Sequence, residues 1–451
     1  MFKENKGIYK KIGVVALPII LQNIIDAAVN SADVLMLNTV GQTAISSVSL
    51  SNSFVGLIFM FQYGIGTGIA MLAAQYYGKK DMKTIEKIEG IGLRFALTVA
   101  CLAMILCMGF PKAVLYLYTN DTELINVGAQ YMRVIAPGFI FWAISSVYMS
   151  VLRCIDRVGT STVLEAVALI CNVCLNAVFI FGLFGAPQLG VVGVGLATSI
   201  SRLVQLIGCM IVSIKAEVKL DIRTMLVKHP LLQKDFMSMA MPAIANDVVW
   251  SVAFSMYSVI LGHLGTDAVA ANAIVNTVRN LGTVMCYGVG SAAGIIVGQI
   301  LGEGSMDEAI RTGHILYRLS FITGIAGGLI VLAIAPFAIS TAALSPVALD
   351  YLKFMLLVNT YYITGTSVNT TLIAGIFRAG GDSKFGFICD TIDMWVYAVP
   401  LGFLAAFVFK LPVKWVYFLL CTDEFVKWPW VLKHYYSRKW AKNITRDEIM
   451  E

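Results

Sequence analysis

The chain has 451 residues, of which 58% are hydrophobic and only 13% are charged. Soluble proteins average about 25% charged residues, so this composition excludes an ordinary water-soluble enzyme, and the apolar content excludes intrinsic disorder. The net charge of +6 comes from basic residues dispersed between apolar stretches rather than gathered on one face, which argues against nucleic acid as a partner.

Twelve apolar segments follow one another along the chain, and each is close to the roughly 20 residues that a membrane-crossing helix needs. They cover residues 12–38, 43–77, 92–118, 128–152, 158–184, 190–214, 236–262, 267–300, 312–341, 350–377, 384–409 and 412–434. We therefore predict an all-α polytopic membrane protein with twelve transmembrane helices in two six-helix lobes. The predicted domains are an N-terminal lobe (1–214), a cytoplasmic linker (215–235), a C-terminal lobe (236–434) and a cytoplasmic tail (435–451).

Basic residues predict the orientation of these helices. If both termini are cytoplasmic, 26 of the 33 Lys and Arg lie at the cytoplasmic ends of the segments and four lie in outside loops. Lys and Arg concentrate on the cytoplasmic side of membrane proteins. We expect a multi-pass protein of the plasma (inner) membrane with the lipid bilayer around it.

The two halves of the chain resemble each other in sequence. One register of the repeat, the first register, aligns Pro18 with Pro242 and Gly41 with Gly265 without a gap, and 15 of the 67 positions from 16 to 82 are identical. One position further on, the second register aligns Arg153 with Arg378. Because six spans is an even number, both copies enter the membrane in the same sense, which is typical of transporters whose two lobes rock against each other.

Polar residues interrupt the first apolar segment on a single face. Asn23, Asp26, Asn30 and Asp33 are spaced by three, four and three positions, so they share one side of a helix. One interpretation is hydrogen bonding between helices. The other is a site for a cation or a proton, since carboxylate and amide oxygens are ligands for hard cations and charged groups inside a membrane need a reason.

The fifth segment repeats this pattern with Glu165, Asn172 and Asn176, which also share a face. Thr198 in the sixth segment is placed to complete a set of oxygen ligands. Asparagines in membrane helices also serve to hold helices together, so this alternative stays open.

In the second half, Asp390 and Asp393 lie one helical turn apart and Trp395 follows closely. Carboxylates beside aromatic rings suit an organic cation, so these residues are candidates for substrate binding, with Asp247 as a weaker one. The alternative is pairing with an Arg or Lys. Pairing with Lys427 also explains Asp423 and Glu424.

Taken together, several motifs resemble those of the multidrug and toxin extrusion (MATE) transporters, over nearly the whole chain. They are Pro18 with Asn30-x-x-Asp33, Asn172-x-x-x-Asn176-x-x-Phe179-Ile180-Phe181-Gly182, Gly193-x-Gly195-x-Ala197-Thr198 and Arg378-Ala-Gly-Gly-Asp382. The resemblance implies two six-helix lobes and antiport: export of amphipathic, often cationic compounds and drugs in exchange for H⁺ or Na⁺. It implies no catalytic residues and no cofactor.

Individual positions are closer to the DinF-like than to the NorM-like branch of that family. Asp33, Asn172 and Thr198 match the acid, the Asn and the Thr of the DinF-like site, whereas Asn176 replaces its second acid. Trp250 occupies the position where the NorM-like branch has a Glu. The resemblance therefore implies that Asp33 is the principal titrating group and the ligand of any Na⁺. We expect a monomer.

Three other functions are weighed against antiport. A flippase for lipid-linked compounds needs a cationic cavity for pyrophosphate, and only Arg133, Arg202 and Arg279 lie within the apolar segments. A membrane-embedded enzyme needs a catalytic His or a metal cluster, but all four His fall at segment ends or in loops. A channel does not require the internal repeat.

Overall fold

A computed structural model of the protein describes residues 6–342 and 344–446, without the side chains of Lys6, Asn30, Ser31, Val34, Leu35 and Asn38. Within this part of the chain the secondary structure is helical, with no β-strand. Ten of these helical stretches are long and apolar enough to cross a membrane. The two other predicted spans correspond to a 24-residue helix with its π-helical continuation at 346–377 and to three short helices at 413–436. The predicted twelve-helix, all-α fold is confirmed.

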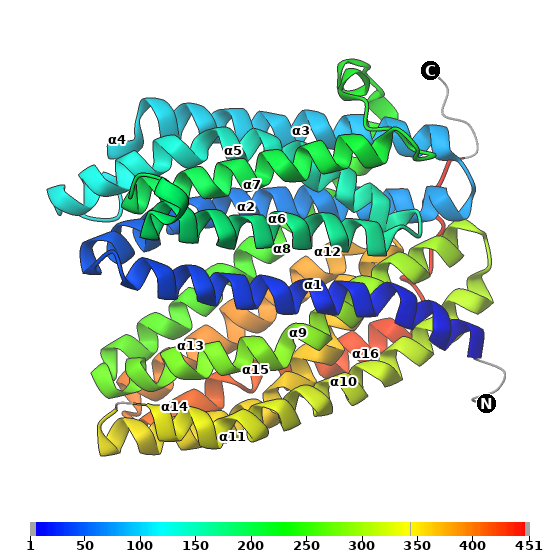
Figure 1. Ribbon diagram of the computed structural model, residues 1–451. Coiled ribbons are helices and arrows are strands. Elements are labelled where there is room, and N and C mark those ends of the chain that lie inside the picture. The colour runs from blue at the N-terminus through cyan, green and yellow to red at the C-terminus, as the bar shows by residue number, and fades with distance from the viewer. Residues whose placement is uncertain (1–5, 343, 447–451) are drawn as a thin grey trace. The chain divides into compact units, whose positions relative to one another are not determined.

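Six long helices form the first half of the fold, and Figure 1 shows most of them running side by side. They are α1 (Lys6–Asn38), α2 (Gln42–Gly78), α3 (Met82–Gly109), α5 (Thr122–Cys154), α6 (Val158–Phe181) and α7 (Gly190–Ser213), with the short α4 (Pro111–Tyr116) before α5. Helix α5 contacts α2, α3 and α7, and α6 packs on α7. Small residues allow this close packing: a Cβ on Gly66 of α2 would lie 2.9 Å from the Ser150 Oγ of α5.

The second half is also built from long helices that pack on one another. Its first helices are α8 (Pro230–His263), α9 (Thr266–Gly302), α10 (Met306–Thr341) and α11 (Pro346–Asn369), which continues as a π-helical segment, η3 (Thr370–Phe377). Helix α9 contacts α10, α11 and η3. A buried apolar core that includes Val275, Val331 and Ile363 joins these helices.

Helices of equal length at equivalent positions show the internal repeat in three dimensions. Helices α2 and α9 both have 37 residues, and their first residues, Gln42 and Thr266, coincide in the first register. Each follows a glycine with positive φ, 126° at Gly41 and 122° at Gly265. Glycine is the residue that adopts such angles without strain, so the repeat preserves the turn as well as the helix.

The last two spans are interrupted helices. Helix α12 (Ser383–Ile392) continues through η4 (Asp393–Ala398), α13 (Val399–Phe403) and η5 (Leu404–Val408), of which η4 and η5 are π-helical. The final span divides into α14 (Val413–Leu420), α15 (Asp423–Val426) and α16 (Trp428–Tyr436). Such π-helical stretches occur frequently at functional sites. Both interruptions place acidic residues, Asp393 and Asp423, at the start of a new segment.

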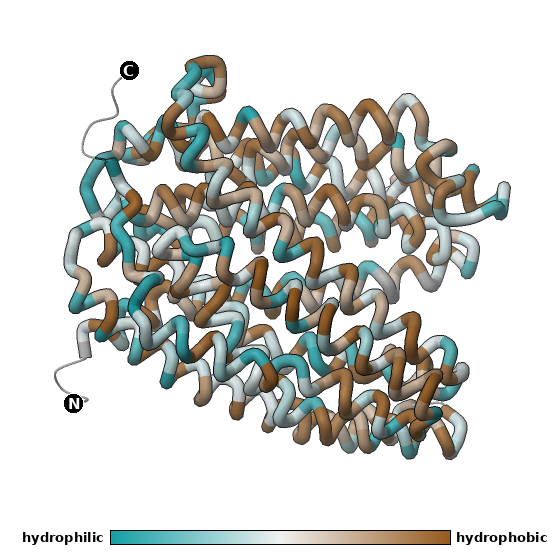
Figure 2. Tube along the Cα trace, turned by 180° about the vertical axis from the view of Figure 1, so that it is seen from behind, coloured by the Kyte–Doolittle hydropathy of each residue, from teal (hydrophilic) through white to brown (hydrophobic). Residues whose placement is uncertain are grey.

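Hydropathy along the chain matches a membrane protein. Figure 2 shows hydrophilic residues mainly in the connections and at helix ends, whereas the middles of the long helices are mostly apolar. Large apolar side chains remain exposed on single helices, for example Leu17, Leu102 and Leu329, each more than half exposed. Exposure of this extent is expected where a helix faces lipid rather than water.

The described residues divide into two compact units, which we call the N-unit (21–237) and the C-unit (6–20 with 238–446). The division passes through α1, between Ile20 and Leu21, and through α8, between Met237 and Ser238. The lobe boundaries expected from the sequence stay a prediction. All contacts described below lie within one unit.

Candidate functional site

In the N-unit, the four residues proposed for ion coupling lie together. The Asn176 Nδ2 of α6 donates to the Asp33 Oδ1 of α1 at 2.8 Å and is 3.3 Å from the Asn172 Oδ1. The Asn172 Nδ2 in turn donates to the Thr198 Oγ1 of α7 at 3.2 Å. A continuous set of hydrogen bonds therefore joins α1 to α6 and α7, two helices that are distant from it in sequence.

The chemistry of this network suits a small cation or a proton. Asp33 is the one carboxylate among the four residues, and the side-chain oxygens of the Asn and Thr residues are neutral ligands. Asn176 is 1% exposed, and its Oδ1 has no hydrogen-bond partner among the described residues. A buried carbonyl oxygen without a donor is costly, which makes this atom available to a bound cation.

The other members of the predicted polar face behave differently. Glu165 is 7% exposed and pairs with Arg202 of α7, with Oε1 and Nη1 2.9 Å apart, while Gln205 donates to its other oxygen. Asn23 and Asp26 are half-buried, and the charges of Glu165 and Arg202 act on Asp26. The side chain of Asn30 lies outside those that the structure describes. Glu165 thus forms an ion pair of its own beside the Asp33 network.

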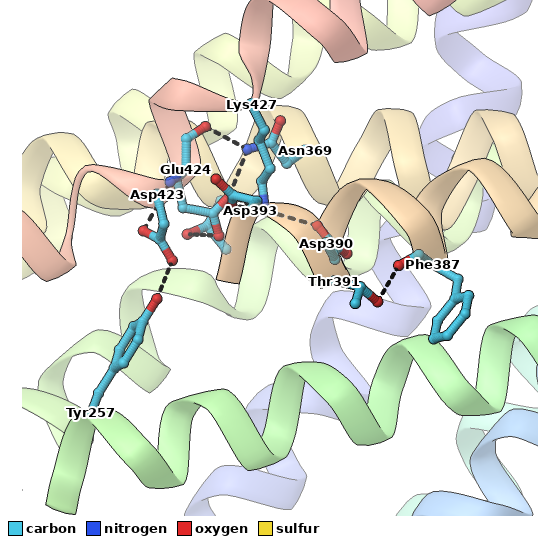
Figure 3. Close-up of polar contacts among 10 residues, drawn as sticks. Tyr257, Asn369, Phe387, Asp390, Thr391, Asp393, Asp423, Glu424 and Lys427 are labelled. Atoms are coloured by element: carbon cyan, nitrogen blue, oxygen red, sulfur yellow. Dashed lines mark hydrogen bonds and ion pairs between the residues drawn. The ribbon is translucent and has the colours of Figure 1, made fainter. Parts of the chain in front are cut away.

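In the C-unit, the two acids suggested for substrate binding surround a buried lysine instead. Lys427 Nζ lies 3.0 Å from Asp390 Oδ1 and 3.7 Å from Asp393 Oδ2 (Figure 3). Its third partner is Glu424, at 3.2 Å from Oε2, which confirms the pairing expected between these two residues. Both Asp390 and Asp393 are therefore paired with a basic residue, which was the alternative to substrate binding. Neither side chain is more than 7% exposed.

Asp247 and Trp395 lie outside this group. The Asp247 Oδ1 of α8 is 2.8 Å from the Arg378 Nη2, and the Trp395 Nε1 donates to the Val249 carbonyl oxygen at 3.3 Å. Both side chains therefore have partners within the C-unit. Asp390 and Asp393 share Lys427, whereas Asp247 and Trp395 each have a different partner.

Sequence reasoning missed how many groups gather around Lys427, which was counted among the basic residues of the cytoplasmic C-terminal end. This residue is 4% exposed, and Asp423 and Glu424 beside it are at least as deeply buried. Tyr257 of α8 donates to the Asp423 Oδ2 at 3.0 Å, and Asn369 of α11 donates to Glu424. The repeat contained the signal, because its second register places Lys427 on Arg202 and Asp390 on Glu165.

A cavity of about 270 Å³ lies in the C-unit, between α8, α9, α11 and α14. Its lining is mixed, with Ser255 and Asn276 among the polar residues. Arg279 also lines it and stacks on the Phe254 ring at 5.1 Å. Tyr257 lines the same cavity, so its hydroxyl group links the cavity to Asp423.

Comparison with known proteins agrees with the repeat. The MatE family model matches residues 18–178 and again residues 242–404. The probable multidrug resistance protein YoeA of Bacillus subtilis is 24% identical, over 92% of this chain and 90% of its own. The probable multidrug resistance protein NorM of Thermotoga maritima is 23% identical, over 100% of this chain and 97% of its own. A solved MOP superfamily transporter from Pyrococcus furiosus has the same fold, with a TM-score of 0.86 at 18% identity over 95% of this chain and 96% of that one.

Proposed function

Since the chain belongs to the MATE family of membrane transporters, we propose that it is a secondary active antiporter that exports amphipathic, cationic organic compounds in exchange for H⁺ or Na⁺. The observation that carries this proposal is the hydrogen-bonded network of Asp33, Asn172, Asn176 and Thr198. It supplies one carboxylate that changes charge and neutral ligands that hold a cation beside it.

The proposed mechanism uses the charge of Asp33. A proton or Na⁺ on this carboxylate removes its net charge, which changes the strength of its hydrogen bond with Asn176 and the packing of α1 against α6. A bound ion drives alternating access only if it binds more tightly to one of the two states of the transporter. The Asp33 network therefore couples the ion gradient to export by favouring one state when it is occupied.

The assignment to the DinF-like branch is part of this proposal. Its support is that Asp33, Asn172 and Thr198 lie within one network, whereas Trp250 occupies the position of the NorM-like Glu. The cationic class of the substrate rests on the family resemblance and on relatives that are named multidrug resistance proteins. Asp390 and Asp393 add little to it, because Lys427 already occupies their shared face.

We further propose a monomer in the plasma membrane with both termini in the cytoplasm. In this scheme residues 1–214 and 236–434 are the two lobes, 215–235 is a cytoplasmic linker and 435–451 is a cytoplasmic tail. The support is the excess of Lys and Arg at the proposed cytoplasmic ends. Lys427 no longer contributes to that excess, since it is buried among acids, but the remaining basic residues are still strongly asymmetric.

The test is transport in proteoliposomes under an imposed pH or Na⁺ gradient, with a panel of fluorescent organic cations. We expect Asp33→Asn to reduce gradient-driven transport by more than about tenfold, equivalent to about 1.4 kcal/mol of coupling free energy. Asp121→Asn is the matched control, because Asp121 caps α5 from an exposed loop and asparagine also caps helices. Full gradient-driven transport by Asp33→Asn would show that the coupling site lies elsewhere. Comparison of the two gradients identifies the ion.

A further inference from the structure

The acids around Lys427 outnumber the available positive charge. Four carboxylates, from Asp390, Asp393, Asp423 and Glu424, lie in the acidic cluster with one ammonium group. Each of these five residues is at most 5% exposed. Isolated charges in a medium of low dielectric constant are so unfavourable that such groups neutralise instead. One lysine balances only one of the four carboxylates.

Hydrogen bonds satisfy some of the acids but leave one of them bare. Asp423 accepts from Tyr257 and from the Glu424 amide, and Glu424 accepts from Asn369 and Thr366. Both oxygens of Asp393 lack a hydrogen-bond partner among the described residues, although its side chain is 3% exposed and directed at Lys427 (Figure 3). The one cation beside it, Lys427, lies 3.7 Å away and is shared at shorter distances with Asp390 and Glu424, so a bound proton is the remaining way to neutralise Asp393.

The repeat relates this cluster to the ion-coupling region of the N-unit. In the second register, Asp390 and Lys427 correspond to the ion pair Glu165 and Arg202. In the same register Asp393, Asp423 and Glu424 correspond to Ala168, Thr198 and Ser199. The C-unit therefore keeps the ion pair and adds three acids, one of them at the position of Thr198 in the Asp33 network.

We propose that the acidic cluster is a second proton-binding site of the transporter, which takes up protons on the carboxylates that Lys427 does not neutralise. The ligand is H⁺ rather than Na⁺, because the Lys427 ammonium already lies within 3.0–3.7 Å of three of the acids, where a metal ion would be repelled. Tyr257 provides the connection to solvent, since it lines the C-unit cavity and donates to Asp423. Proton binding is independent of transport; only its role in coupling rests on the proposed function.

Among the described residues, no second cation is placed to take over from Lys427. The remaining titratable groups around the cluster are the phenols of Tyr257, Tyr361 and Tyr362 and the thiols of Cys389 and Cys421. Arg279 of α9 forms no ion pair with the four acids among the described residues, and its charge acts on Cys421 and Tyr362. Protons are therefore the remaining means of neutralising the cluster.

The test is infrared spectroscopy of the full-length protein in lipid nanodiscs at neutral pH, where a protonated carboxyl group has a carbonyl band that a carboxylate lacks. We expect Asp393→Asn and Asp423→Asn each to reduce this band relative to the wild type. We expect Lys427→Met to increase it, because one more carboxylate then needs a proton. Glu165→Gln is the matched control: its acid is already paired with Arg202, so the band is expected to stay unchanged.

Each outcome decides the proposal. A band unchanged in Asp393→Asn, Asp423→Asn and Lys427→Met would overturn it. If one variant does not fold, as judged by gel filtration, the others still give the answer, and the Lys427→Met change has the opposite sign. Asp33→Asn separates this inference from the proposed function, because we expect that variant to lose coupled transport while it keeps the band differences at Asp393 and Asp423.

Discussion

The two units carry the same ion pair at equivalent positions of the repeat but surround it with different numbers of acids. In the N-unit, Glu165 and Arg202 balance each other, and their side chains are 9% and 18% exposed. In the C-unit, the side chains of Asp390 and Lys427 are 7% and 3% exposed, and they share their environment with three more carboxylates. The repeat thus preserves a structural ion pair, and the C-unit copy has three further buried acids packed around it.

A second difference concerns which helix carries the carboxylate. Asp33 of α1 corresponds to Tyr257 of α8 in the first register, and Thr198 corresponds to Asp423 in the second. Each unit therefore has one acid and one hydroxyl group at these two equivalent positions. The acid lies on the first helix in the N-unit and on the last span in the C-unit. In the C-unit the two groups are in direct contact at 3.0 Å, whereas in the N-unit two asparagines lie between them. Two sites of related geometry arise from one scaffold.

The largest expected difference between the units is the cost of removing the cation. Lys427→Met leaves four buried acids without a countercharge, and loss of one partner of a buried pair costs about 3–5 kcal/mol. Arg202→Met leaves one acid that still accepts from Gln205, so its cost is expected to be clearly smaller. Unfolding in detergent, followed by Trp fluorescence, measures both free energies.

The pH dependence of these two variants makes the comparison sharper. Acid pH supplies protons to the uncompensated carboxylates, so the destabilisation by Lys427→Met should shrink as the pH falls and grow as it rises. The change for Arg202→Met should be smaller, because Glu165 is more exposed than the acids around Lys427 and still accepts a hydrogen bond from Gln205. Equal destabilisation of the two variants at every pH would mean that the extra acids of the C-unit do not interact with Lys427.

Much of this architecture was predictable from the sequence, because it depends on patterns that local physics fixes. Twelve apolar segments and the repeat predicted the helices, and helical spacing put Asn172 and Asn176 on the face that meets Asp33. The pairing of Asp390 and Asp393 with Lys427 was not predictable in the same way. One-turn spacing shows that two acids share a face, but not that a lysine from the following span lies against them.

Interrupted helices explain why helical periodicity alone does not predict that contact. Lys427 lies between α15 and α16, and a residue at such a break does not follow the helical periodicity of its neighbours. Asp393 similarly begins the π-helical segment η4, where the register of side chains shifts. Hydropathy therefore located the last spans, while their breaks determined which polar side chains meet.

Another prediction tests whether the helices of the two units approach each other equally closely. Gly328 of α10 lies so close to α11 that a Cβ would collide with the Thr360 carbonyl oxygen, a backbone atom that cannot move aside. Its counterpart in the second register is Ala103, which already has a Cβ and is 4% exposed. We expect Gly328→Ala to destabilise the protein by about 1–3 kcal/mol through overpacking. The same unfolding assay measures this change.

The reverse substitution in the N-unit is the control. Ala103→Gly is expected to cost only about 0.5–1 kcal/mol, through the lower helix propensity of glycine. If Gly328→Ala were no more destabilising than Ala103→Gly, the close approach of α10 and α11 would not be a constraint that distinguishes the C-unit.

The smallest expected effect concerns the ion pair between Asp382 and His434, which the N-unit does not repeat. Asp382 lies just before α12, and its Oδ2 is 2.8 Å from the His434 Nε2 of α16. In the second register its counterpart is Arg157. Burial raises the pKa of Asp382, but the hydrogen bond and charge of His434, together with the charge of Lys442, outweigh this effect and lower the pKa below its ordinary value.

A carboxyl group whose pKa is lowered in the folded state stabilises the fold above the unfolded-state pKa, about 3.9. This contribution is lost as the pH falls through the folded-state value. Asp382→Asn should therefore lower the free energy of unfolding by about 1 kcal/mol or less near neutral pH, since both side chains are partly exposed. The difference from the wild type should disappear in strong acid. A deficit that persisted there would mean that Asp382 acts by packing rather than by its charge.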